Sequence, residues 1–144
     1  MIFEAKKDKF FSTIFYGVIL LLGAVSVIAI KSVNEKNEWI GIVITILTLL
    51  FLVWVWYGTE YKIENNVLRI VSGPIKKNIP IRTIKKVEMG KTLWVGYKFG
   101  LSKGGVIIQY NEYDEVYISP EDNEKFCKAL KRIHSDIEIA KNID

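Results

Sequence analysis

The sequence predicts an α+β protein: a hairpin of two transmembrane helices, followed by a small antiparallel β-barrel or sandwich that one C-terminal helix caps. Three observations lead to this fold class. Two long stretches without charges lie before residue 58, short runs of alternating apolar and polar residues follow, and a segment with helical periodicity ends the chain. We therefore expect a membrane hairpin at residues 1–57 and a water-soluble domain at residues 58–144.

The second uncharged stretch, Trp39–Tyr57, is nineteen residues long. As a helix it spans about 28 Å, close to the hydrocarbon thickness of a bilayer. Trp39 opens the stretch, and Trp54, Trp56 and Tyr57 close it, which is typical of amphipathic rings at the two membrane interfaces. We expect a transmembrane helix at residues 39–57.

The first uncharged stretch, Phe10–Ile30, has twenty-one residues, enough to cross a bilayer with some tilt. A cleaved signal peptide is the alternative, because lysines precede the stretch and Val27-Ile28-Ala29 resembles a cleavage site. The stretch is longer than the usual apolar core of a signal peptide. We therefore expect a retained transmembrane helix at residues 10–30.

The polar segment Lys31–Glu38 is short, so the two helices should be antiparallel neighbours. Gly41, Thr45 and Thr48 form a stripe of small residues on the second helix, along which another helix could approach closely. We expect this stripe to pack inside the hairpin. The alternative is a homo-oligomer formed through the helices.

The positions of lysine and arginine near the two spans predict the orientation. Three lysines precede the first span, two lie in the loop, and four basic residues follow the second span within about twenty residues. Cytoplasmic flanks carry an excess of such residues. We therefore expect a multi-pass protein of the cell membrane, integral to the lipid bilayer, with both termini in the cytoplasm.

After Tyr57 the pattern changes to short strands separated by turn residues such as Asn65-Asn66 and Gly104-Gly105. Strands that recur about every ten residues are typical of an antiparallel sheet that curls or closes. The expected strands lie at residues 61–64, 67–71, 79–81, 84–89, 106–110 and 113–118, with an aromatic-rich segment at 92–101.

The C-terminal segment predicts one helix that covers the sheet. Ser119 is a natural N-cap, and Pro120 fits the first helical position. An apolar face with helical spacing follows, made by Phe126, Leu130, Ile133 and Ile137.

The soluble part resembles the bacterial pleckstrin-homology-like domains, in particular the YyaB-like PH family. The resemblance covers residues 58 to about 133 and depends on the segments Tyr61-Lys62-Ile63, Ser72-Gly73-Pro74-Ile75, Ile79-Pro80-Ile81 and Tyr113–Pro120, with Phe126 and Leu130. It implies a seven-stranded, partly open barrel capped by a helix, a fold used for binding rather than chemistry. Some similar membrane-tethered bacterial proteins act in self-resistance to secreted antibacterial peptides.

The charge of the soluble part is unevenly distributed. Residues 69–103 contain nine lysines or arginines and one acid, whereas residues 104–144 contain five basic residues and nine acids. We expect a basic face that contacts the anionic inner leaflet or a ligand, unless it is simply a solvated sheet surface. The candidate residues of this face are Lys76, Lys77, Arg82, Lys85, Lys86 and Lys91.

Three aromatic residues, Trp94, Tyr97 and Phe99, lie among the glycines of the 92–101 segment. They are candidates for lining a ligand or peptide groove. Aromatic residues at this spacing in a strand region also occur in the core or on a sheet surface, and this second interpretation is the more common one.

No residue set in the sequence predicts catalysis, a metal site or a cofactor. Cys127 and His134 are the only cysteine and histidine, and they belong to no ligand cluster. A tethered domain with an acidic half is also a poor nucleic-acid binder. We therefore expect a non-catalytic binding or scaffolding module at the inner face of a bacterial cell membrane, with a membrane protein or peptide as partner. The alternative is a structural or regulatory membrane-protein subunit that acts through its helices.

Overall fold

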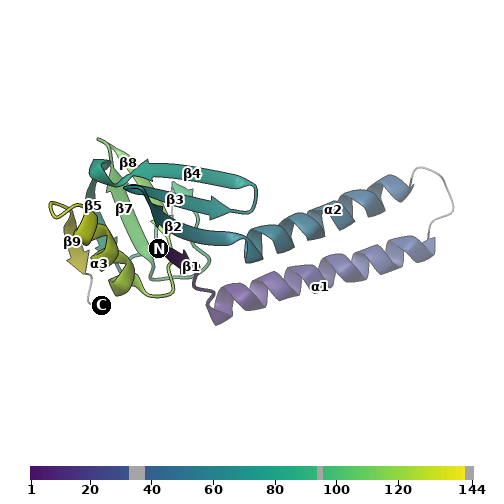
Figure 1. Cartoon of the computed structure of the whole chain (residues 1–144). Helices are drawn as coiled ribbons and strands as arrows, with labels where there is room; N and C mark the ends of the chain where they lie inside the picture. Colours follow the sequence, from purple (N-terminus) through teal and green to yellow (C-terminus); the bar gives the residue numbers. More distant parts are fainter. Residues whose placement is uncertain (33–37, 94–95, 142–144) are drawn as a thin grey trace.

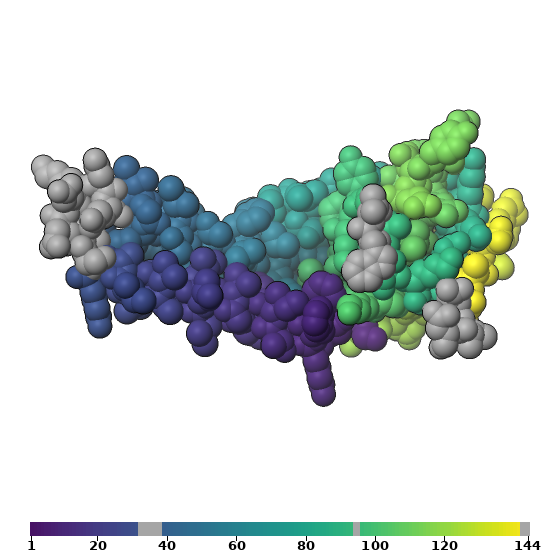
Figure 2. All heavy atoms as spheres, turned by 180° about the vertical axis from the view of Figure 1, so that it is seen from behind, coloured from purple at the N-terminus to yellow at the C-terminus, as the bar shows by residue number. Residues whose placement is uncertain are grey.

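The structure is a computed structural model of the 144-residue chain and describes residues 1–32, 38–93 and 96–141. Figure 1 shows a long helical hairpin that projects from one end of a domain made of strands and one short helix. The C-terminal strand, yellow in Figure 2, lies at the other end of this domain, away from the hairpin.

The hairpin consists of α1, Lys9–Ser32, and α2, Glu38–Tyr57. Both helices are long and apolar enough to cross a membrane, over Lys9–Lys31 and Trp39–Tyr57, which confirms that the two predicted stretches are helical. Among the described residues, the most apolar part of α1 is 0% buried and that of α2 is 11% buried. Helices with so little protein cover expose apolar surface that suits lipid rather than water.

The two helices are in contact near the domain. The ring of Phe15 on α1 stacks on the ring of Trp56 on α2, with the ring centroids 4.2 Å apart. The prediction that the small-residue stripe packs inside the hairpin is wrong for Gly41. Gly41 is exposed, and apart from its chain neighbours and the backbone of its own helix, no described atom lies within 4 Å of the place where a Cβ would stand. Thr45 and Thr48 donate their hydroxyl hydrogens to carbonyl groups of their own helix.

The first sheet has four antiparallel strands in the order β1-β2-β3-β4. Asn65 and Asn66 have φ of 51° and 61° in the turn between β2 and β3, as the asparagine pair predicted. In place of the strand expected at residues 79–81, the structure has a longer strand, β4, which starts at Ile75. It ends at Pro80 because Ile81 begins a 3-10 helix, Ile81–Thr83. The strands are β1, Ile2–Glu4; β2, Thr59–Glu64; β3, Val67–Ser72; and β4, Ile75–Pro80.

The second sheet has five strands in the order β6-β8-β7-β5-β9. The sequence predicted antiparallel pairing, but β6 runs parallel to β8 and β9 runs parallel to β5. The strands are β5, Ile84–Met89; β6, Tyr97–Lys98; β7, Val106–Tyr110; β8, Asp114–Ile118; and β9, Glu138–Lys141.

The C-terminal helix is α3, Asn123–Ile133, and it begins later than predicted. Its N-cap is Asp122, whose Oδ1 accepts a hydrogen bond from the backbone N–H of Lys125 (2.9 Å). Ser119 instead belongs to an extended link, since its neighbour Pro120 forms a β-bridge with Ala5. Phe126 and Leu130 are buried as expected, whereas Ile133 is 41% exposed. Ile137 is buried beyond the end of the helix.

The domain is joined to both helices by very short links. Gly58 alone lies between α2 and β2, and four residues lie between β1 and α1. Phe3 of β1 packs on Phe126 of α3, with the ring centroids 5.2 Å apart. The N-terminal strand is therefore part of the sheet domain. The predicted division of the chain at residue 57 stays a prediction.

Candidate functional site

The six predicted basic residues come from three elements and the segment after β5. Lys76 and Lys77 lie on β4, Arg82 lies in the 3-10 helix, Lys85 and Lys86 lie on β5, and Lys91 follows β5.

Two of these lysines are paired with carboxylates. Glu88 lies 3.2 Å from the Nζ of Lys86 and 2.9 Å from that of Lys91. The hydrogen bond from Lys91 lowers the pKa of Glu88, and burial raises it. The hydrogen bond from Lys86 lowers it again, so the pKa of Glu88 stays below its ordinary value. Glu138 lies 3.9 Å from Lys86 as well. These pairs reduce the charge that Lys86 and Lys91 offer to a ligand.

Lys77 is engaged with aromatic rings. Its Nζ lies 4.0 Å from the ring centroid of Tyr97 and 5.2 Å from that of Tyr110, distances typical of cation–π contacts. Lys77 belongs to the first sheet and both tyrosines to the second, so this contact joins β4 to the strands across from it.

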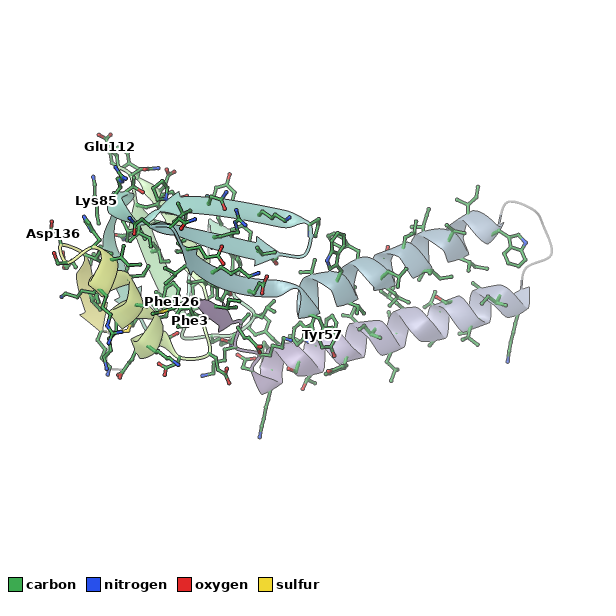
Figure 3. All side chains as sticks on the ribbon, in the orientation of Figure 1. Phe3, Tyr57, Lys85, Glu112, Phe126 and Asp136 are labelled. Carbon is green, nitrogen blue, oxygen red and sulfur yellow. The ribbon has the colours of Figure 1, made fainter. Side chains whose placement is uncertain are left out.

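Arg82 and Lys85 are exposed. Figure 3 shows Lys85, Glu112 and Asp136 at the end of the domain farthest from the hairpin, whereas Tyr57 marks the end of α2. If the helices cross a membrane, this end of the domain points away from it. The charge pattern in the sequence could not reveal this placement.

Two of the three predicted groove aromatics, Tyr97 and Phe99, lie in the part of the chain that the structure describes. Phe99 is only 9% exposed and belongs to the hydrophobic core, whereas Tyr97 is 64% exposed on β6. Trp94 lies outside the described residues. The placement of Tyr97 and Phe99 fits the alternative of core and sheet surface.

A second group of cations, which sequence reasoning missed, surrounds the ends of the helices nearest the domain. Each of three lysines lies over an aromatic ring of a helix end: Lys7 over Tyr57 (4.6 Å), Lys98 over Phe11 (5.4 Å) and Lys103 over Phe10 (4.5 Å). Lys9 is the first residue of α1, and all four lysines are exposed. We call Lys7, Lys9, Lys98 and Lys103 the helix-end lysines.

Asp8 joins the start of α1 to the domain. Its Oδ1 accepts a hydrogen bond from the backbone N–H of Phe11 (2.8 Å), so Asp8 caps the helix. Its Oδ2 accepts one from the backbone N–H of Lys103 (3.0 Å). Burial raises the pKa of Asp8, but these bonds and the nearby Lys103 charge outweigh it and hold the pKa below its ordinary value.

Two buried tyrosines hold the segment that carries Lys98 and Lys103. The Tyr61 hydroxyl donates to the carbonyl of Phe99 (2.8 Å) and accepts from the N–H of Ser119 (3.2 Å). The Tyr117 hydroxyl donates to the carbonyl of Ser102 (2.5 Å) and accepts from the N–H of Gly105 (3.0 Å). Burial raises the pKa of Tyr61 to about 12 and also raises that of Tyr117. Both hydroxyls therefore stay protonated and keep donating.

The same part of the domain needs glycine at two positions. A Cβ on Gly100 would overlap the ring of Tyr117, and one on Gly105 would overlap the carbonyl oxygen of Ile118. These close approaches bring the 99–105 segment onto β8 and place Lys103 beside the start of α1.

Several shallow grooves lie on the surface. A groove of about 610 Å³ follows the first turns of α1, lined by Lys9, Ser12, Thr13, Tyr16, Gly17 and Leu20. A second, of about 260 Å³, lies at the β2–β3 turn beside β4 and is lined by Glu64, Asn65, Val67, Arg69, Asn78 and Pro80. These shallow surfaces suit contact with another molecule better than the enclosure of a reacting substrate.

Within the described residues, no group of three or more His, Cys, Asp or Glu side chains could hold a metal ion. Cys127 is buried, and its burial raises the pKa of the thiol to about 12. A thiol in that state is a poor nucleophile at neutral pH.

The comparisons with known proteins agree with this architecture. The "Bacterial PH domain" family matches residues 59–134, which include most of both sheets and all of α3. A Bacillus subtilis (strain 168) protein, printed as "Uncharacterized protein YyaB", is 30% identical to the chain over 143 residues. The alignment covers 96% of this chain and 97% of the relative, so the similarity extends over the helical hairpin as well. No solved structure matches the chain.

Proposed function

Because this chain belongs to the bacterial PH domain family, we propose that it is a non-catalytic binding or scaffolding module, anchored at the inner face of a bacterial cell membrane by its helical hairpin. The observation that best supports this proposal is how the domain is attached. One residue joins β2 to α2, and β1 leads through four residues into α1. With both helices in a bilayer, such short links would hold the domain in one orientation.

In that orientation the far end of the domain would face the cytoplasm. We propose that this end binds the partner, through Arg82, Lys85 and the β7–β8 turn. Tyr113 in this turn is 93% exposed, and Figure 3 shows Lys85 and Glu112 at this same end of the domain. Exposed aromatic and arginine side chains contribute strongly to protein–protein contacts. The partner would be a membrane protein or a peptide; in one version it is an antibacterial peptide against which the protein protects its producer.

The alternative is a structural or regulatory subunit that acts through its helices. The exposed positions Gly41 and Thr48 of α2 favour it, because the described part of α1 leaves this surface of α2 uncovered. Small residues on an uncovered helix surface allow close approach of a second helix.

Site-specific photo-crosslinking in bacterial cells separates these functions. A photo-reactive amino acid is placed at position 85 or 113 on the far end of the domain, or at position 48 on α2. We expect a discrete adduct from positions 85 and 113 and none from position 48. The shift in mass on a gel separates a peptide partner from a membrane protein.

Adducts from position 48 alone would favour the helix-based alternative. If all three positions react with nothing while the protein is correctly inserted, the proposal of a binding module is wrong.

A further inference from the structure

We propose that the end of the domain nearest the helices is a docking surface for the anionic headgroups of phospholipids, in the same bilayer that holds the hairpin. The surface is formed by the helix-end lysines. This inference rests on the membrane anchoring proposed above, but it concerns different residues from those proposed to bind a partner.

The contacts of three of these lysines place their charges at the depth of the headgroups. The rings beneath Lys7, Lys98 and Lys103 belong to the last residue of α2 and the first turn of α1. Aromatic rings at the ends of membrane helices lie at headgroup level. An ammonium group about 5 Å from such a ring lies where the phosphates of the lipid are.

The charge of this surface is strongly positive. Asp8 lies among the helix-end lysines, and its two oxygens accept hydrogen bonds from backbone N–H groups of Phe11 and Lys103. The four lysine charges outnumber this carboxylate, so the group formed by these five residues is positive. Anionic lipids attract such a surface, and the attraction decreases within a Debye length of the membrane.

The groove along α1 adds a shape that suits a lipid. Lys9 lies at its outer end, Ser12 and Thr13 follow in the next turn, and Gly17 and Leu20 lie deeper along the helix. This order of cation, hydroxyl and apolar surface matches the order of phosphate, glycerol ester and acyl chain in a phospholipid. At about 610 Å³ the groove is large enough for part of one lipid molecule.

The test uses the full-length protein in vesicles of phosphatidylcholine that contain a small fraction of spin-labelled lipid. Electron spin resonance then measures how strongly the protein prefers spin-labelled phosphatidylglycerol to spin-labelled phosphatidylcholine. One variant changes Lys7, Lys9, Lys98 and Lys103 to glutamine. A matched variant removes the same charge from α3, which lies away from the hairpin in Figure 1, by changing Lys125, Lys128, Lys131 and Arg132 to glutamine.

We expect the natural protein to prefer phosphatidylglycerol about fivefold or more, as one or more well-placed lysines would produce. The helix-end variant should lose most of this preference, and the α3 variant should keep it. High salt should weaken the preference of the natural protein, since the contact is exposed.

Equal preference for both lipids in the natural protein would overturn the proposal, as would an equal loss in both variants. Matching circular dichroism spectra and melting temperatures show that the variants are folded. The lipid preference and the photo-crosslinks concern separate residues, so one proposal can fail while the other stands.

Discussion

Replacement of Gly105 with alanine is expected to destabilise the sheet domain by about 3 kcal/mol or more, because overpacking against backbone cannot relax. The new Cβ would overlap the carbonyl oxygen of Ile118 and lie 2.8 Å from the Tyr117 hydroxyl oxygen. The Gly105 N–H also donates to that hydroxyl, so the displaced segment would lose a buried hydrogen bond. For a domain of this size the melting temperature should fall by about 12 °C or more.

The control is the same replacement at Gly41, where the new Cβ would meet no described atom within 4 Å apart from its chain neighbours and its own helix backbone. Gly41→Ala should leave the melting temperature of the domain unchanged, as followed by circular dichroism in detergent. If the Gly105→Ala variant had the same melting temperature as the natural protein, this result would contradict the close packing of the 99–105 segment on β8.

Truncation of Phe126 to alanine is expected to cost about 3–5 kcal/mol, the usual range for a fully buried phenylalanine. Its side chain is 0% exposed, and its ring meets that of Phe3 edge to face at 5.2 Å. Because Phe3 lies on β1, the cavity should also loosen the strand that leads into α1. Hydrogen exchange of the β1 amides should therefore become faster, in addition to the fall in overall stability.

Ile133→Ala on the same helix serves as the control, since Ile133 is 41% exposed and its truncation should cost about 1 kcal/mol or less. Equal losses from the two truncations would show that α3 does not cover the core as described. Unchanged exchange in β1 would separate this strand from the core.

Local patterns in the sequence predicted much of the fold. The two helices follow from uncharged stretches of membrane length, and the strand predicted at residues 106–110 is β7 itself. The asparagine turn at residues 65 and 66 follows from the tolerance of asparagine for positive φ. In each case the signal lies within a few neighbouring residues.

The elements that sequence reasoning missed depend on distant contacts. β1 has three residues and is stabilised by pairing with β2, about sixty residues later in the chain. β9 pairs in parallel with β5 and follows α3 closely in the chain, and Ile137, just before β9, continued the helical pattern in the sequence. Such short strands have no pattern of their own that could be read from the sequence.

The residues of the predicted basic face are likewise divided among several elements. Lys86 and Lys91 are paired with Glu88, and Lys85 lies at the end of the domain away from the helices. The helix-end lysines come from the start of the chain and from a segment some ninety residues later, which the contact between Asp8 and Lys103 joins. Charge counts along the sequence cannot reveal which cations meet in space.

These placements also bear on the orientation of the hairpin. Lys98 and Lys103 add two positive charges to the side of the helices where the domain lies, beyond those that flank the spans in the sequence. The polar segment Lys31–Glu38 between the two uncharged stretches has two lysines and two glutamates. The basic residues that flank the spans in the sequence favour a cytoplasmic domain, and Lys98 and Lys103 would then lie beside the anionic inner leaflet.

The location of the domain is tested most directly by reporter fusions after Asp144 in bacterial cells. One fusion carries a fluorescent protein that matures only in the cytoplasm, and the other carries a phosphatase that is active only outside it. We expect a fluorescent first fusion and an inactive second one. An active phosphatase with a dark fluorescent protein would place the domain outside the cell and contradict a module at the inner face of the membrane.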